Sequence, residues 1–243
     1  MPSKSKKGFF MLSMVYGILL HVFVMINAAN EKDSQGVAIM GMGLTLVTVW
    51  ILIGGYLQRR YLFSHYERLT QVRSSPVFTF AIMAIFLACI EELIAVIITN
   101  LAPLYGVTVG EAYITASTNY FDVITMHSVI VFAPMLFTLG VILRKYAIPP
   151  FRALIIFGLV GVCAEFSFAG PQAILAFPTW LFIYGLMVYV PAHIFVNTER
   201  KKPFFLLYPL FIIAILASAI TTVWIPIVSH HPKIDFISET ATN

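Results

Sequence analysis

Six ionisable side chains interrupt stretches of this sequence that are otherwise long and apolar. They are three histidines and three glutamates: His21, Glu91, Glu92, His127, Glu165 and His193. Carboxyl and imidazole groups can relay protons, ligate a metal or a haem iron, or activate a water molecule. Because an ionisable group is costly inside a membrane, each of the six is a candidate functional residue.

Five of the six candidates are predicted to lie in the outer half of the membrane. At about 1.5 Å of rise per residue, His21, His127 and Glu165 lie roughly 12, 9 and 8 Å from the external ends of their helices. Glu91 and Glu92 lie roughly 15 Å from the external end of theirs, whereas the sixth candidate is near a cytoplasmic end. We expect these five groups to converge on one buried site, because pairing offsets the cost of burying each polar group.

The immediate neighbours of these residues refine the expectation. Adjacent glutamates on a helix point about 100° apart, so we expect one of Glu91 and Glu92 to line the site and the other to pair with a different helix. Ser128 and Thr125 flank His127. We expect both to orient its ring through hydrogen bonds, as the partners of a metal-bound histidine do.

Seven apolar stretches carry these residues, and each is long enough to cross a hydrocarbon core, which requires about 20 residues per helix. They cover residues 8–29, 37–58, 77–102, 121–143, 151–170, 171–196 and 203–228. No internal repeat or long linker separates them. Residues 1–243 are therefore predicted to form a single all-α domain, a polytopic membrane bundle of seven transmembrane helices.

The basic residues predict the orientation of this bundle. Thirteen of the 15 Lys and Arg residues lie in four alternating segments: before the first apolar stretch and after the second, fourth and sixth. Cytoplasmic loops carry an excess of Lys and Arg, so the N-terminus is predicted to be cytoplasmic and the C-terminus external.

The composition excludes several classes of protein. The 243 residues are 60% hydrophobic and 11% charged, with a mean hydropathy of +0.90, which leaves no room for a soluble catalytic domain. The net charge of +4 is explained by the orientation signals, so no nucleic acid is expected as a partner. Cys89 and Cys163 form no C-x-x-C pattern, which argues against a thiolate metal site. We expect an integral protein of a prokaryotic cell membrane that contacts the lipid bilayer and other membrane subunits.

One segment, residues 120–131, resembles the second transmembrane helix of haem-copper oxidase subunit I. It reads YFDVITMHSVIV. In that family a tyrosine and a short apolar run precede a T-x-H-[GAS] motif, matched here by Thr125, His127 and Ser128, and the histidine is an axial ligand of the low-spin haem. The likeness in layout extends over residues 77–196, including the long external loop before this helix.

The resemblance implies a single low-spin haem, or a related fold that persists without a cofactor. His127 would be one axial ligand, and His21 is the internal candidate for the second, so both histidines are the predicted cofactor and metal ligands. The histidines of the family's copper site cannot be placed in this chain. The implied function is therefore that of a redox or structural subunit of a respiratory membrane complex, an electron-transfer component that does not itself reduce oxygen.

Two other classes of protein would use the same side chains. The pair Glu91-Glu92 resembles the start of the E-E-x-x-x-R motif of CAAX-processing-type membrane proteases, although Val96 occupies the arginine position. An intramembrane metalloenzyme or protease would use one of these glutamates as a general base, with His127 and His21 positioning water or a metal. A proton or ion transporter, or a quinone site, would instead exchange protons through the carboxyl groups, including that of Glu165.

Overall fold

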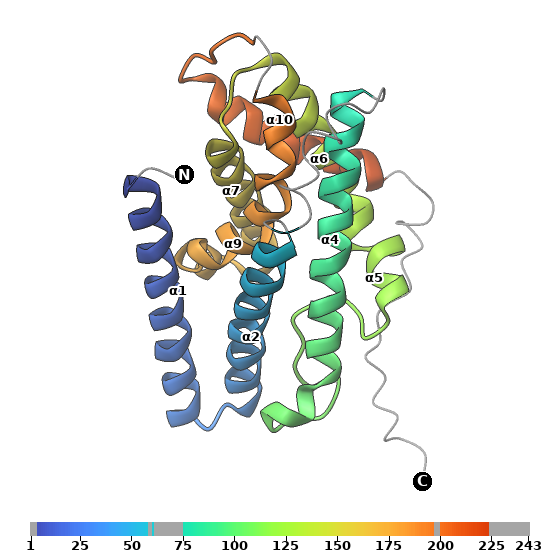
Figure 1. The fold of residues 1–243 in the computed structure, drawn as a ribbon. Helices are drawn as coiled ribbons and strands as arrows, with labels where there is room; N and C mark the ends of the chain where they lie inside the picture. The colour runs from blue at the N-terminus through green and yellow to red at the C-terminus, as the bar shows by residue number, and fades with distance from the viewer. Residues whose placement is uncertain (1–3, 58–59, 61–74, 197–199, 224–243) are drawn as a thin grey trace.

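The computed structural model describes residues 4–57, 60, 75–196 and 200–223, and within them the chain is helical, with turns and loops between the helices (Figure 1). Its elements are α1 (Lys4–Asn30), α2 (Ser34–Leu57), α4 (Pro76–Asn100), η2 (Ala102–Tyr105), α5 (Tyr120–Met126), α6 (Ser128–Lys145), α7 (Pro150–Ala169), α8 (Gln172–Leu175), α9 (Phe177–Tyr189), η3 (Pro191–Phe195) and α10 (Leu207–Val223). The predicted all-α class is confirmed for these residues.

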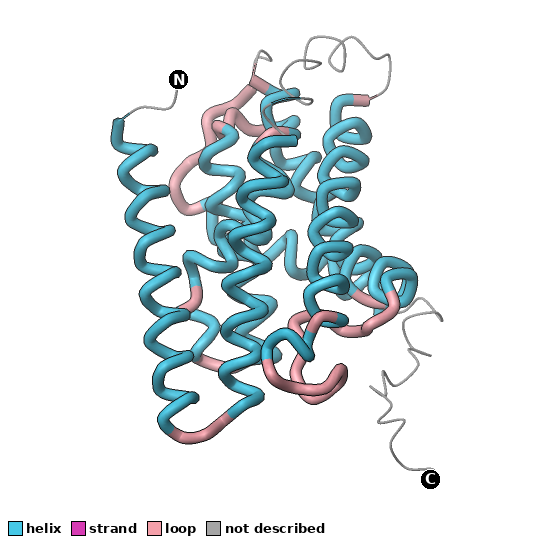
Figure 2. Tube along the Cα trace, turned by 60° about the horizontal axis from the view of Figure 1, so that its bottom comes forward, coloured by secondary structure: helices cyan, strands magenta, loops and turns pink. Residues whose placement is uncertain are grey.

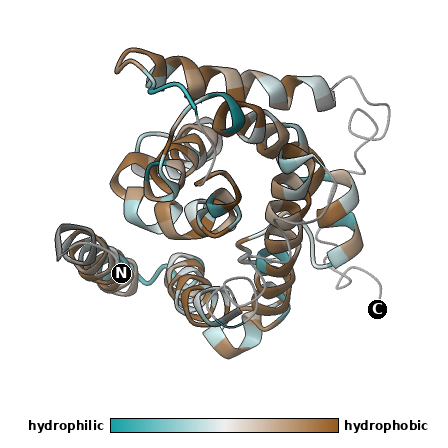
Figure 3. Cartoon of the chain, turned by 45° about the horizontal axis from the view of Figure 1, so that its top comes forward, coloured by the Kyte–Doolittle hydropathy of each residue, from teal (hydrophilic) through white to brown (hydrophobic). Residues whose placement is uncertain are grey.

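Four of the helices are long and apolar enough to cross a membrane. These segments are Gly8–Asn30, Ser34–Tyr56, Pro76–Asn100 and Ser128–Lys145, and two shorter apolar helices cover Phe177–Tyr189 and Leu207–Thr221. Most helical segments are hydrophobic along their length (Figure 3). The chain is therefore an integral membrane protein whose helices contact lipid, whereas seven complete spans remain a prediction.

Several connections between helices lie at two opposite ends of the bundle (Figure 2). The α1–α2 turn and the loop over residues 101–119 lie at one end, and the segments 146–149 and 200–206 lie at the other. This grouping agrees with the alternation of basic segments in the sequence. The basic residues at 59, 68 and 73, and the predicted external tail after residue 228, lie outside the described residues.

The predicted helix over residues 121–143 is divided in two at His127, whose φ of −132° and ψ of −100° are not helical. The Asn119 side chain caps the start of α5 by accepting a hydrogen bond from the backbone N–H of Phe121. Thr125 bonds back to the carbonyl oxygen of Phe121 at 2.6 Å, an arrangement that bends helices. The break therefore occurs next to a threonine rather than at Pro134, which lies inside α6.

The predicted helix over residues 171–196 is also divided, into α8, α9 and η3. Pro178 lies in the first turn of α9 and Pro191 in the first turn of η3, positions where the missing N–H leaves no hydrogen bond unmade. The last helix, α10, runs obliquely across the bundle in two views and packs on α6 and α7 (Figures 1 and 3).

Helices α7 and α9 make the most intimate helix pair, because glycines allow their backbones to approach closely. A Cβ atom at Gly158 would lie 2.9 Å from the Cα atom of Leu181, and one at Gly185 would lie 2.9 Å from the carbonyl oxygen of Leu154. At Gly161 a Cβ atom would overlap the ring of Tyr184. This contact fixes where the tyrosine ring lies and therefore where its hydroxyl group points.

Helix α1 lies at the edge of the bundle, packed mainly on α2 and α9. Its outer face is apolar and exposed, with Leu12, Leu19 and Phe23 each at least 63% exposed. In a bilayer this face contacts lipid.

Candidate functional site

Three glutamates from two helices form the most unusual feature of the interior. Glu91 and Glu92 lie in the middle of α4 with only 4% and 6% of their surface exposed, and Glu165 lies on α7. The carboxyl group of Glu91 interacts electrostatically with those of Glu92 and Glu165, and Glu92 also interacts with Glu165. We refer to Glu91, Glu92 and Glu165 as the carboxyl cluster.

Both adjacent glutamates are buried because α4 is the central helix of the bundle. It contacts α2, α6, α9 and α5, so directions about 100° apart on its surface both point into protein. Glu92 accepts a hydrogen bond from the hydroxyl group of Thr115, at 3.0 Å, and lies near the hydroxyl group of Ser128. For Glu91, the charged groups nearby are those of Glu92 and Glu165. The expectation that the two side chains have different surroundings agrees with this arrangement.

Tyr184 completes the cluster from a third helix. Its hydroxyl group donates a hydrogen bond of 2.6 Å to Oε1 of Glu165. The tyrosine ring is held edge-on by Phe132, with a centroid distance of 5.4 Å, and by Phe157 at 6.4 Å. The apolar rings of Phe132 and Phe157 therefore cover the side of the cluster on which Tyr184 lies.

His127 is linked to the cluster through its neighbour. Its Nδ1 atom lies 2.9 Å from Oγ of Ser128, the hydroxyl group that lies near Glu92. Tyr120 anchors α5 on α4 by donating to the carbonyl oxygen of Cys89 at 3.1 Å. The predicted contact from Ser128 is present, but that from Thr125 is wrong because its hydroxyl group bonds to its own helix instead.

His21 lies elsewhere. Helix α1 is at one side of the bundle and α5 is at the opposite side (Figure 1). Nδ1 of His21 bonds to the carbonyl oxygen of Gly17 at 2.8 Å, one turn earlier in the same helix. Depth along a helix predicts the level of a residue in the membrane but not the side of the bundle on which it lies. The prediction of one site shared by His21 and His127 is therefore wrong.

The described residues do not fit the predicted haem. A bis-histidine haem requires two imidazoles facing each other across the iron. Helix α1, which carries His21, packs on α2 and α9, whereas α5 and α6, which meet at His127, pack on α4 and on each other, so the two imidazoles do not face each other across one iron. The same separation means that the two histidines cannot bind one metal ion together. In the described part of the chain, no group of three or more His, Cys, Asp or Glu side chains is arranged to hold a metal ion.

The sixth candidate, His193, lies in η3 and packs against the end of α9. Its Nδ1 atom lies 3.0 Å from the carbonyl oxygen of Tyr189, and its ring packs edge-on against that tyrosine at 5.3 Å. This agrees with its predicted place away from the other candidates.

Two polar residues of the site were not predicted from the sequence. In the sequence, Tyr184 is one of many aromatic residues in apolar segments, and Thr115 lies in a polar loop, so neither context indicates a site. The loop over residues 101–119 reaches the cluster because its end is tied to α4: Nδ2 of Asn100 donates to the carbonyl oxygen of Thr118 at 2.9 Å. A glycine facing the tyrosine, at position 161, was the available signal for a tightly placed ring.

Comparisons of the chain with protein-family models, with curated proteins and with solved structures gave no match. The site must therefore be interpreted from its own chemistry.

Proposed function

We propose that the protein is a proton-coupled membrane transporter in which the carboxyl cluster binds and releases the transported protons. The observation that carries this proposal is the burial of Glu91 and Glu92 in the middle of α4, with Glu165 of α7 near enough to interact with both electrostatically. Neighbouring carboxyl groups in a medium of low dielectric favour a shared proton over several separate charges, and in this proposal the cluster carries that proton. Intramembrane carboxyl groups are characteristic of proton relays.

Hydroxyl groups extend the cluster in the manner of a relay, because a hydroxyl both donates and accepts a hydrogen bond. Ser128 connects Glu92 to His127, and Tyr184 bonds to Glu165. Thr115 brings the loop over residues 101–119 into contact with Glu92. On the side of Phe132 and Phe157 the cluster meets hydrocarbon, so protons enter from the end of the bundle that carries this loop.

The proposal is tested by proton flux into liposomes that contain the purified protein and a trapped pH-sensitive dye. An imposed pH gradient with a potassium diffusion potential should acidify these vesicles faster than protein-free vesicles. Glu91→Gln keeps the shape of the side chain but carries no exchangeable acid proton. It should lower the flux by about a factor of 100, within the range attributed to positioned acid–base groups.

The matched control is Glu111→Gln, in an exposed loop where the carboxylate accepts the backbone N–H of Thr108. This variant should retain the wild-type flux. Equal fluxes from the wild-type protein and Glu91→Gln would exclude the cluster as the proton carrier.

We also propose that the chain crosses the membrane seven times, with the N-terminus in the cytoplasm and the C-terminus outside. The alternation of basic segments supports this topology. Single cysteines in a variant lacking Cys89 and Cys163 would test it, read out with a membrane-impermeant maleimide on intact cells. Position 111 should be labelled from outside, and position 145 only after the membrane is opened.

A hydrolase is the second candidate, because the hydroxyl group of Ser128 lies between the imidazole of His127 and the carboxyl group of Glu92. In an acyl transfer, the serine oxygen would attack the carbonyl carbon while its proton passes to the imidazole, which would then give that proton to the leaving group as the bond between this group and the carbonyl carbon breaks. A fluorophosphonate probe would label the wild-type protein and not Ser128→Ala. The absence of labelling in the functional protein would remove this candidate and leave the transporter.

The redox-subunit interpretation depends on a haem that the described residues do not fit. A reduced-minus-oxidised absorbance spectrum of the native membrane protein tests it independently. A sharp α band that disappears in His127→Ala would restore it.

A further inference from the structure

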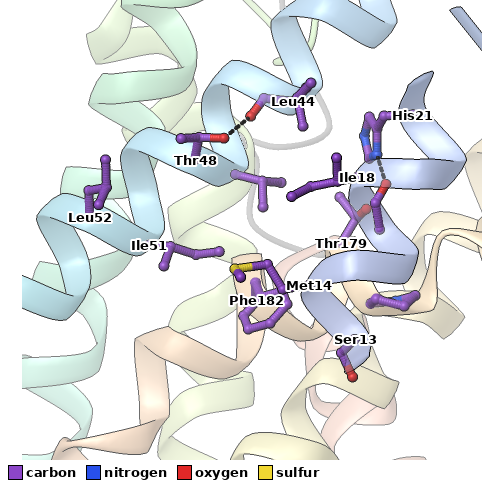
Figure 4. Close-up of a pocket in the computed structure, with 13 residues that line it drawn as sticks. Ser13, Met14, Ile18, His21, Leu44, Thr48, Ile51, Leu52, Thr179 and Phe182 are labelled. Atoms are coloured by element: carbon purple, nitrogen blue, oxygen red, sulfur yellow. Dashed lines mark hydrogen bonds between the residues drawn. The ribbon is translucent and has the colours of Figure 1, made fainter. Parts of the chain in front are cut away.

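A cavity of about 160 Å³ lies between α1, α2 and α9 (Figure 4). Its walls are mostly apolar and include Met14, Ile18, Val47 and Phe182. The carboxyl cluster does not contribute to it. The cavity is therefore a separate feature from the proposed proton site.

Two polar groups line this cavity without a complete set of hydrogen bonds. The hydroxyl oxygen of Thr179 is buried and has no partner among the described residues, and the residue is only 6% exposed. His21 is 8% exposed and uses Nδ1 to donate to the carbonyl oxygen of Gly17, which leaves Nε2 as an acceptor in the neutral ring. A buried hydroxyl group without a partner costs free energy, so a polar ligand atom placed beside it is favoured.

We propose that this cavity binds an aromatic ring that carries a hydroxyl group, as in an alkylphenol, and that the ligand enters from the bilayer. The volume suits one such ring, because an apolar cavity of roughly 150 Å³ engineered in another protein binds benzene. A ring hydroxyl can accept a hydrogen bond from Thr179 and donate one to Nε2 of His21. An acyl chain would fill the space but leave the threonine hydroxyl unsatisfied.

The position of the cavity explains the route of entry. Met14, Ile18 and Leu52 line it and are 41%, 42% and 66% exposed, so its rim belongs to the lipid-facing surface. Helix α1 forms one wall and is held mainly by α2 and α9. A ligand dissolved in the bilayer reaches the cavity between α1 and α2 without passing through water.

The test is ¹⁹F NMR of the wild-type protein in lipid nanodiscs, titrated with 4-fluorophenol and with fluorobenzene. The wild-type protein should show one saturable site for each probe, and 4-fluorophenol should bind more tightly. Thr179→Val preserves the shape of the side chain and removes its hydroxyl group. It should lower the affinity for 4-fluorophenol about tenfold, as expected for the loss of one hydrogen bond, and leave the affinity for fluorobenzene unchanged. Thr179→Ser should retain the binding of 4-fluorophenol.

A second variant tests the cavity itself. A Cβ atom at Gly17 would meet only the Cβ of Pro178 at 3.8 Å, so Gly17→Leu can project into the cavity without displacing the backbone. It should abolish the saturable site for both probes. Gly8→Leu, on the same helix with open space around it, is the matched control and should bind like the wild type. Saturable binding that survives in Gly17→Leu, or equal weakening of both probes by Thr179→Val, would overturn the proposal.

The rate of binding tests the source of the ligand. 4-Nonylphenol concentrates in the bilayer and should therefore bind to the empty site faster than phenol does at the same total concentration. Equal association rates for the two compounds would show entry from water and would contradict the bilayer route.

Discussion

The hydroxyl group of Tyr184 on α9 and the carboxyl group of Glu165 on α7 are joined by a hydrogen bond of 2.6 Å inside the membrane domain. This bond lies where the two helices approach most closely, beside Gly161. Because Glu165 interacts with both glutamates of α4, the same bond also positions one member of the carboxyl cluster. Helix packing and the proposed proton chemistry therefore depend on one contact.

Replacing Tyr184 with Phe should lower the free energy of unfolding and slow the proposed proton flux. Interhelical side-chain hydrogen bonds in membrane proteins contribute on average about 0.6 kcal/mol, with a maximum near 1.7 kcal/mol, so we expect a loss in this range. The free energy of unfolding from a detergent-denaturation titration measures it. Tyr56→Phe, on the exposed part of α2, is the matched control and should change neither quantity. An unchanged flux in Tyr184→Phe would mean that the tyrosine only supports packing.

Replacing Gly161 with Ala tests the packing that places the tyrosine ring. The added methyl group would overlap the ring of Tyr184, and overpacking of this kind costs about 1–3 kcal/mol. Gly55→Ala has open space around it and should instead be stabilising by up to about 1 kcal/mol, through the higher helix propensity of alanine. The same denaturation titration compares the two variants. Equal stability of both would show that α7 and α9 can move apart at little cost.

The sequence was sufficient to predict the helical class, the apolar segments and the most informative polar residues. Hydropathy identifies segments long enough to cross a bilayer, and the cost of burying charge identifies Glu91, Glu92 and Glu165 as residues that need partners. The cluster that they form agrees with this reasoning. Its partner Tyr184 was missed because a tyrosine in an apolar helix gives no sign of which helix its hydroxyl group faces.

The failures have a common physical cause. Helical rise gives the depth of a residue, so His21 and His127 were placed at one level, but the arrangement of helices around the bundle depends on packing between segments distant in sequence. The break at His127 was missed because neither proline nor glycine marks it. A threonine that bonds to its own helix, as Thr125 does, is too common in apolar helices to predict a break.

Replacing Ser128 should separate His127 from the carboxyl cluster. Ser128→Ala removes the hydroxyl group that contacts both the imidazole and Glu92, and the proposed relay then loses that branch. We expect a lower proton flux in Ser128→Ala and a flux near the wild-type value in Ser128→Thr, which keeps a hydroxyl group. Thr125→Ala, whose hydroxyl group bonds only within α5, serves as the control in the same liposome assay. A full flux in Ser128→Ala would exclude the imidazole from the path.

Replacing Arg200 tests how the opposite end of the bundle is held. Its Nη1 atom donates to the carbonyl oxygens of Leu143, at 2.8 Å, and Tyr146, at 3.0 Å, where α6 ends. The next residue, Lys201, strengthens the same junction through its backbone. Its carbonyl oxygen accepts a hydrogen bond of 2.8 Å from the N–H of Ala147. Arg200→Ala leaves two carbonyl groups without this donor and should lower the free energy of unfolding by about 1–3 kcal/mol.

The control for Arg200 is Lys202→Ala, which removes an exposed positive charge from the same segment and should have an effect within about 0.5 kcal/mol. Arg200→Lys keeps the charge but not the forked geometry, so it should recover only part of the stability. Because this contact is distant in the fold from the loop that reaches Glu92, the variant protein that remains folded should keep its proton flux. A loss of flux at full stability would instead show that the two ends of the bundle are coupled, and that movement of α6 is part of transport.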